Sequence, residues 1–118
     1  MTTRDPDAYL PLKPAVFHIL LALLDGERHG WALHRELEAQ PDAGRALPGN
    51  LYRTLRDLAR AGLIEETDRR PDPELDDERR RYFAVTELGR SVAAAEARRL
   101  ERMVAAARAR RLLEGRNG

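Results

Sequence analysis

The sequence predicts a mainly α-helical fold with one small β-hairpin and a long C-terminal helix. Three observations support this fold class. Apolar residues recur at helical spacing in three short segments of the first half of the chain. The pattern then changes to two strand-like segments, and helical spacing returns after them over residues 87–114. Helices followed by a two-stranded hairpin form the winged helix-turn-helix arrangement, in which the hairpin is the wing.

Length and composition limit what this chain can be. Its 118 residues provide one domain with a modest core. The lack of cysteine excludes disulfides, thiolate metal sites and cysteine nucleophiles. Because the formal net charge is only +1, binding to nucleic acid would depend on local clusters of arginine. We expect a cytoplasmic protein with a loose N-terminal arm over residues 1–12, a winged helix-turn-helix domain over 13–86, and a dimerisation helix and tail over 87–118.

The first helix is expected to begin near Pro14 and to end at Asp25-Gly26. Proline suits the first helical position because its missing N–H is not needed there. Residues 15–24 are nearly all apolar but too few to span a bilayer, so we interpret them as a buried core helix and expect no membrane association.

A second, shorter helix is expected to begin at His29-Gly30 and to stop before Pro41. The residue before a proline disfavours the helical conformation, which sets this limit. Residues 41–44 are expected to form a turn, and residues 45–47 are long enough only for a very short strand.

The third helix follows Pro48-Gly49 and ends near Gly62, where a C-cap glycine belongs. The two strands are expected over residues 63–70 and 79–85, joined by a polar connection with two prolines. Thr86 is a good N-cap for the last helix.

The third helix has two contrasting faces. Leu51, Leu55 and Leu58 form a stripe that suits the core, and three arginines lie opposite it. Arginine presents a planar fork of donors that fits phosphates and guanine edges. The alternative is a solvated charged face on which Asp57 pairs with neighbouring arginines. The candidate DNA-binding residues of this helix and its start are Gly49, Asn50, Tyr52, Arg53, Arg56 and Arg60.

The wing carries charges of both signs. Arg79, Arg80 and Arg81 on its second strand are further candidates for contact with double-stranded DNA. The connection at its tip is acidic, and DNA would repel it. We expect the stem to contact DNA and the tip to stay away; internal pairing of tip acids with stem arginines is the alternative.

The last helix carries an apolar stripe longer than a small domain can cover. The simplest partner is the same helix of a second subunit, which predicts a homodimer. Packing against the first helix of the same chain is the alternative. Both can be true if one part of the last helix packs within the chain and another part forms the dimer. The candidate dimerisation residues are Ala93, Ala97, Leu100, Met103, Val104 and Ala107.

Residues that suggest other chemistry are few. His34 and Glu38 have the spacing of a shared metal site, but without further clustered ligands we expect no metal and no other cofactor. Trp31 is interpreted as a core residue, with a place in a ligand cavity at the dimer interface as the alternative. No phosphate-binding glycine loop or catalytic constellation is present, so we predict that the chain is not an enzyme.

Several runs of residues resemble PadR-type transcriptional regulators. They are residues 17–24, 29–33, 47–55, then Leu58 and residues 61–64, and finally 80–89. The resemblance implies a dimeric repressor that places its third helix in the major groove of an inverted-repeat operator. It also implies a small aromatic or drug-like effector that binds near the dimer interface and releases DNA.

The resemblance has limits. With a single helix expected after the wing, the chain resembles the shorter branch of the family. Three features depart from the family pattern: Asn50 where Thr is usual, Trp31 where Tyr is common, and the acidic wing tip. The rival hypothesis is a winged-helix interaction module that docks a protein partner, which the near-neutral charge would suit.

Overall fold

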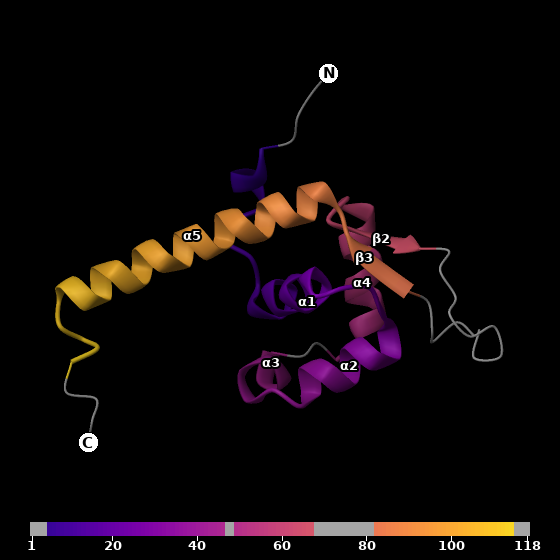
Figure 1. Cartoon of the computed structure of the whole chain (residues 1–118), viewed down its shortest axis with the longest axis horizontal. Coiled ribbons are helices and arrows are strands. Elements are labelled where there is room, and N and C mark those ends of the chain that lie inside the picture. Colours follow the sequence, from indigo (N-terminus) through magenta and orange to yellow (C-terminus); the bar gives the residue numbers. More distant parts are fainter. Residues whose placement is uncertain (1–4, 47–48, 68–81, 115–118) are drawn as a thin grey trace.

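The computed structural model describes residues 5–46, 49–67 and 82–114. Within these ranges the long helix α5 lies across α1, with the N-terminal segment on its other side and the remaining helices and the sheet below (Figure 1). In chain order the elements are η1 (Pro6–Tyr9), α1 (Pro14–Leu24), β1 (Arg28–His29), α2 (Gly30–Glu38), α3 (Pro41–Ala46), α4 (Leu51–Arg60), β2 (Ile64–Thr67), β3 (Tyr82–Val85) and α5 (Glu87–Ala109). The mainly helical winged-helix fold is thus confirmed.

Helix α1 forms the centre of the core. It begins at Pro14, as predicted, and Lys13 before it provides no side-chain cap. Ile19 and Leu20 have no exposed surface, and α1 contacts α2, α3, α5 and β3. The chain leaves the helix through Gly26, whose φ of +141° is rarely adopted by residues with a side chain. Across the described residues, no helix is both long and apolar enough to cross a membrane.

The sheet has the strand order β1–β3–β2, with both pairs antiparallel. The hairpin strands β2 and β3 were predicted, although their expected outer ends, 68–70 and 79–81, lie outside the described residues. Strand β1 was not predicted. It pairs Arg28 with Phe83 and His29 with Tyr82, so it covers the free edge of β3 just before α2 begins.

The turn expected over residues 41–44 and the strand expected over 45–47 are wrong. Residues 41–46 form the short helix α3, and Leu47 lies outside the described residues. Pro41 accounts for the difference, because it ends α2 and also suits the first position of a new helix. The N–H of Gly44 donates to the carbonyl of Gln40 at 2.6 Å, which closes the first turn.

The described part of the N-terminal arm is not loose. Asp5 caps η1 by accepting a hydrogen bond from the N–H of Asp7. Tyr9, Leu10 and Leu12 pack partly buried against the core cluster. Element η1 contacts α5 and lies on the side of α5 that faces away from α1 (Figure 1).

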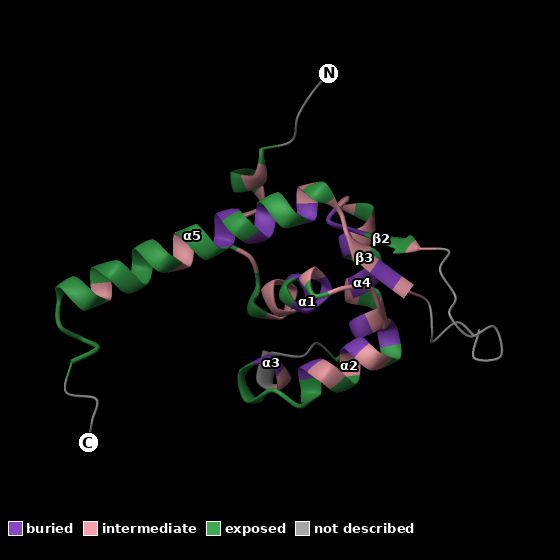
Figure 2. Ribbon diagram, viewed as in Figure 1, coloured by how far each residue is buried: buried purple, intermediate pink, exposed green. Residues whose placement is uncertain are grey.

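Helix α5 begins where predicted and ends earlier. The hydroxyl of Thr86 accepts a hydrogen bond from the N–H of Gly89 at 3.0 Å, which confirms the N-cap. The helix ends at Ala109 rather than near residue 114, and Arg111 beyond it has a φ of +61°. One face of its first half is buried against the body, and its second half extends away from the body and is largely exposed (Figure 2).

Candidate nucleic-acid interface

Helix α4 has well-defined ends. The side chain of Asn50 accepts a hydrogen bond from the N–H of Arg53 at 3.0 Å and caps the first turn. At the other end Gly62 has a φ of +85°. The N–H of Leu63 donates to the carbonyl of Leu58, and that of Gly62 to Ala59, both at 3.0 Å. These two bonds form a Schellman motif, so the sequence determines both limits of the helix.

The two faces expected of this helix are present. Leu51, Leu55 and Leu58 are buried in the core. The other face exposes Arg53, Arg56 and Arg60, the three arginines singled out in the sequence, together with Asp57. Within the described ranges no ion pair joins Asp57 to an arginine. The alternative, a solvated face whose arginines pair with Asp57, is therefore not what the structure shows. The geometry leaves three guanidinium groups available to one partner surface.

The three other candidates near the start of α4 have different surroundings. Gly49 is exposed, and an added Cβ would meet no atom within 4 Å. The side chain of Asn50 is engaged in the cap. Tyr52 is half-buried, and its Cε1 lies 2.5 Å from where a Cβ on Gly30 would be. The ring of Tyr52 therefore sets the close approach of α2 to α4, which needs a glycine at position 30.

The wing is only partly described. Arg79, Arg80 and Arg81 lie outside the described residues, as does the acidic tip. The described base consists of β2 and β3, and the ring of Tyr82 on β3 lies edge-on to that of His29, with centroids 5.3 Å apart. This contact joins the wing to the start of α2.

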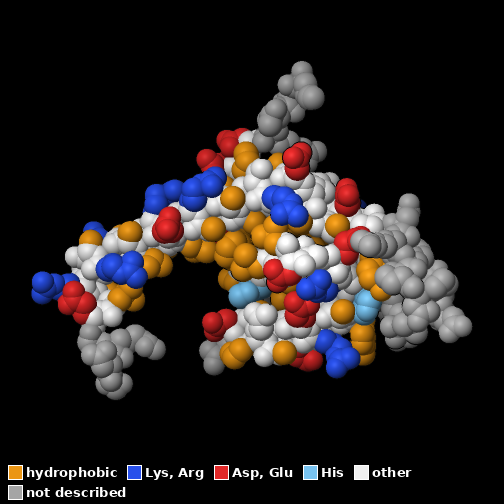
Figure 3. All heavy atoms as spheres, viewed as in Figure 1, with side chains coloured by type: hydrophobic (Ala, Val, Ile, Leu, Met, Phe, Trp, Pro, Cys, Tyr) orange, Lys and Arg blue, Asp and Glu red, His pale blue; other side chains and the backbone are white. Residues whose placement is uncertain are grey.

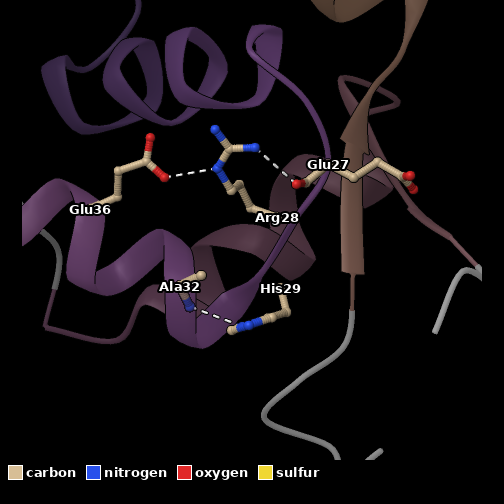
Figure 4. Close-up of polar contacts among 5 residues, drawn as sticks. All are labelled: Glu27, Arg28, His29, Ala32 and Glu36. Carbon is tan, nitrogen blue, oxygen red and sulfur yellow. Dashed lines mark hydrogen bonds and ion pairs between the residues drawn. The ribbon is translucent and has the colours of Figure 1, made fainter. Parts of the chain in front are cut away.

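A polar cluster fixes the segment between α1 and α2. Nδ1 of His29 accepts a hydrogen bond from the N–H of Ala32 at 3.0 Å and so caps α2 (Figure 4). Nε of Arg28 donates to the carboxylate of Glu36 at 2.8 Å, and another nitrogen of Arg28 donates to the carbonyl of Glu27. These bonds hold the first turn of α2 in one orientation beside the wing.

The six candidate dimerisation residues divide between two environments. Ala93 is 3% exposed in the core of its own chain, so it offers no surface to a partner. Ala97, Met103 and Val104 are exposed, and Leu100 and Ala107 are half-buried. Hydrophobic side chains gather along the underside of α5, above the hollow next to the body (Figure 3). Past Ala97, the apolar stripe is therefore uncovered in the single chain.

Sequence reasoning missed a buried ion pair on the same helix. Glu96 is 2% exposed, and Nε of Arg99 donates to its carboxylate at 2.7 Å. The hydrogen bond from Arg99 holds the pKa of Glu96 below its usual value, while burial acts in the opposite direction; a backbone hydrogen bond from Leu12 lowers the pKa further. The signal was available, because Glu96 falls on the apolar stripe with an arginine three residues later.

Two further expectations concern single residues. Trp31 is 47% exposed at the start of α2, so its interpretation as a core residue is wrong. Gly30 and Leu33 turn inward at the start of the helix instead. His34 and Glu38 belong to no cluster: in the described part of the chain, no three His, Cys, Asp or Glu residues lie close enough to hold a metal ion.

A cavity of about 680 Å³ lies between the N-terminal segment, the start of α1 and the side of α4. Tyr9, Leu12, Val16 and Leu58 contribute to its largely apolar wall. The hydroxyl of Tyr9 reaches across toward the carbonyl of Ala61 at 3.5 Å. The volume is in the range of small-molecule sites.

These features define a class of protein: a winged-helix protein whose fourth helix exposes arginines beside the base of a wing. The chain belongs to the PadR-like family of transcriptional regulators, whose family model matches residues 19–95. The predicted family membership is thus confirmed. A search of curated proteins gives no match.

Solved structures agree with the fold. RosR from H. salinarum is 26% identical with a TM-score of 0.55, over 86% of this chain and 97% of that chain. The adhesin competence repressor of Streptococcus pyogenes is 21% identical with a TM-score of 0.55, over 92% of this chain and 71% of that chain. The circadian clock associated protein Pex from Anabaena is 20% identical with a TM-score of 0.55, over 88% and 97%. The last two are similar in fold alone.

Proposed function

We propose that the protein is a homodimeric transcriptional repressor that binds an inverted-repeat DNA operator through α4 and the wing. The observation that carries the proposal is the exposed arginine face of α4 in a member of a family of transcriptional regulators. A helix whose opposite face is anchored by three buried leucines presents these arginines rigidly. The major groove of DNA admits one α-helix, and its guanine edges and phosphates suit guanidinium groups.

The uncovered half of α5 supports the proposed dimerisation. Met103 is 57% and Val104 44% exposed in the single chain. Exposed apolar side chains in a continuous stripe are unfavourable in water, and a second helix that covers them would stabilise the protein. A two-fold dimer would place two copies of α4 in successive turns of the same major groove, so the two half-sites would lie about one helical turn apart.

Release by a small molecule is the third part of the proposal. The cavity beside α4, rather than the dimer interface that the family resemblance implies, supports it, since Thr54 and Leu58 of α4 are part of its wall. A compact, largely apolar effector bound there would displace α4 relative to α1 and so change the presentation of the arginines. Such a compound should raise the melting temperature of the free protein and lower its affinity for DNA. A compound that lowers DNA affinity without stabilising the free protein would exclude this site.

The decisive experiment is fluorescence anisotropy with labelled duplexes from the region upstream of the protein's own gene, at several salt concentrations. A repressor should bind one duplex far more tightly than a scrambled one. The logarithm of affinity should fall steeply with the logarithm of salt concentration, with a slope of about −0.9 per neutralised phosphate. Weak binding that ignores sequence would contradict the proposal and favour the alternative of a protein-docking module.

Variants of α4 make this test specific. Arg53→Ala and Arg56→Ala should each weaken operator binding by about tenfold to a hundredfold, because each removes a contact to a base or phosphate. Their far-ultraviolet circular dichroism and melting temperature should stay at the parent values, since both side chains are exposed. Unchanged affinity in both variants would show that α4 does not read DNA.

A further inference from the structure

Helix α2 exposes two side chains on one face that none of the roles above uses. Trp31 is 47% exposed, and Arg35 follows four residues later, one turn along the same face. Within the described ranges, the guanidinium group of Arg35 forms no hydrogen bond or ion pair. An indole N–H and a guanidinium group, both hydrogen-bond donors, are therefore available next to one another.

The first turn of α2, which carries Trp31, lies next to the elements of the proposed DNA-binding surface. The residue before Trp31, Gly30, lies directly against Tyr52 in the first turn of α4. The next residue back, His29, places its ring edge-on to Tyr82 at the base of the wing. The first turn of α2 thus contacts both elements that the proposed function places on DNA.

The electrostatics of the surrounding surface favour an anion. Trp31 and Arg35 border a shallow depression of about 550 Å³, which Glu36 also lines. The carboxylate of Glu36 is neutralised by Arg28 at 2.8 Å, so the positive charge of Arg35 is left uncompensated there (Figure 4). The hydrogen bond from Ala32 to His29 fixes the backbone of this turn, so binding would need to order only the two side chains.

We propose, on the basis of the proposed function, that Trp31 and Arg35 bind a phosphate of the DNA backbone beside the groove that α4 enters. Arg35 supplies the charge, and the indole Nε1–H of Trp31 donates to a phosphate oxygen while the ring packs against the adjacent sugar. A contact of this kind carries no base information, but it fixes the position of α4 along the duplex.

The chain contains a single tryptophan, which makes Trp31 its own reporter. Quenching of its fluorescence by acrylamide is measured while a mixed-sequence duplex is added at low salt, with the anisotropy of the labelled duplex followed in parallel. DNA should protect Trp31, so the quenching constant should fall about twofold or more as the anisotropy saturates. Saturation of DNA binding with an unchanged quenching constant would overturn the inference and leave the proposed function intact.

Two variants separate the two side chains. Arg35→Ala should weaken binding to operator and to mixed-sequence DNA alike, by about tenfold, and should reduce the salt slope by about one phosphate. Trp31→Phe keeps the aromatic ring but removes the N–H, so it should cost about threefold and leave the salt slope unchanged.

Arg90→Ala is the matched control, since it removes an exposed arginine from the first half of α5, outside the proposed DNA-binding residues and the proposed dimer interface, and it should bind DNA like the parent. Parent-like affinity and salt slope in both α2 variants would overturn the inference. A failure of the parent protein to bind any duplex would instead overturn the proposed function and this inference with it.

Discussion

The two halves of α5 have the same helical spacing of apolar residues, but this face is buried in the first half and exposed in the second. In the first half Gly89, Val92 and Ala93 are buried against the rest of the chain. In the second half Met103 and Val104 continue the same helical face, yet both are largely exposed. One stripe is therefore covered within the chain over its first part and left uncovered over its second.

One continuous apolar stripe can therefore have two roles along a single helix. The first half contributes to the stability of the single subunit, because its apolar side chains complete the core around α1. The second half can contribute only when another surface covers it. The boundary falls at Glu96, the last buried residue of the helix.

The largest expected effect comes from charge in the first half. Val92→Asp places a carboxylate at a position with no exposed surface. Because burial would remove the hydration of the carboxylate, the free energy of unfolding should fall by more than about 4 kcal/mol. Urea denaturation followed by circular dichroism measures the change, and a loss below about 1 kcal/mol would show that this half of α5 is not part of the core.

The same chemistry in the second half should leave folding intact. Met103→Asp alters a side chain that is 57% exposed, so the subunit should remain folded and cooperative. A carboxylate in the proposed helix pair should yield monomers by size-exclusion chromatography with light scattering, with DNA affinity at least about tenfold weaker. A stable dimer with Asp at position 103 would exclude this stripe as the interface.

A smaller effect is expected at the start of the first half. A Cβ added to Gly89 would lie 2.0 Å from the carbonyl oxygen of Leu63 and 2.7 Å from the side chain of Val85. The backbone carbonyl cannot move freely because it accepts the N–H of Thr86. Gly89→Ala should therefore lower the free energy of unfolding by about 2–3 kcal/mol in thermal denaturation. Gly49→Ala, which meets no atom within 4 Å, is the control and should cost far less.

The smallest effect on the free energy of unfolding is expected at Glu96, the boundary between the two halves of α5. The pKa of Glu96 is lowered in the folded state, chiefly by the hydrogen bond from Arg99. Its contribution to stability is therefore fully present above the unfolded pKa of 4.5 and is lost as the pH falls through the lower pKa of the folded state. Glu96→Gln should cost about 1 kcal/mol at neutral pH, and its stability should converge with that of the parent in acid. Glu101→Gln, an exposed neighbour, should differ little at any pH; a pH-independent cost at Glu96 would contradict the ion pair.

Many of the helix boundaries could be predicted because each depends on the residues at that boundary. Pro14 and Gly26 bound α1 through properties of their own backbones. The same holds for Gly62 after α4 and Thr86 before α5. The arginine face of α4 follows from helical periodicity alone once the leucine stripe is seen.

The remaining features depend on partners distant in the sequence. Residues 28 and 29 form a strand only because β3 presents a free edge to them. Trp31 is an exception, because helical periodicity places it opposite the buried Leu33 and Leu37, so its exposure could have been predicted. The burial of Glu96 depends on the N-terminal segment, whose Leu12 donates to it.

Thr86 links the end of α4, the proposed DNA-binding helix, to the start of α5, the proposed dimerisation helix. Its hydroxyl donates to the carbonyl of Gly62 at 2.6 Å, its N–H donates to Leu63 at 3.1 Å, and it caps α5. The end of α4 and the start of α5 therefore meet at one residue that leaves little angular freedom between them. In a dimer joined through α5, this would keep the two copies of α4 at a constant separation. Such a protein would tolerate a changed base more readily than an extra base pair inserted between the two halves of its binding sequence.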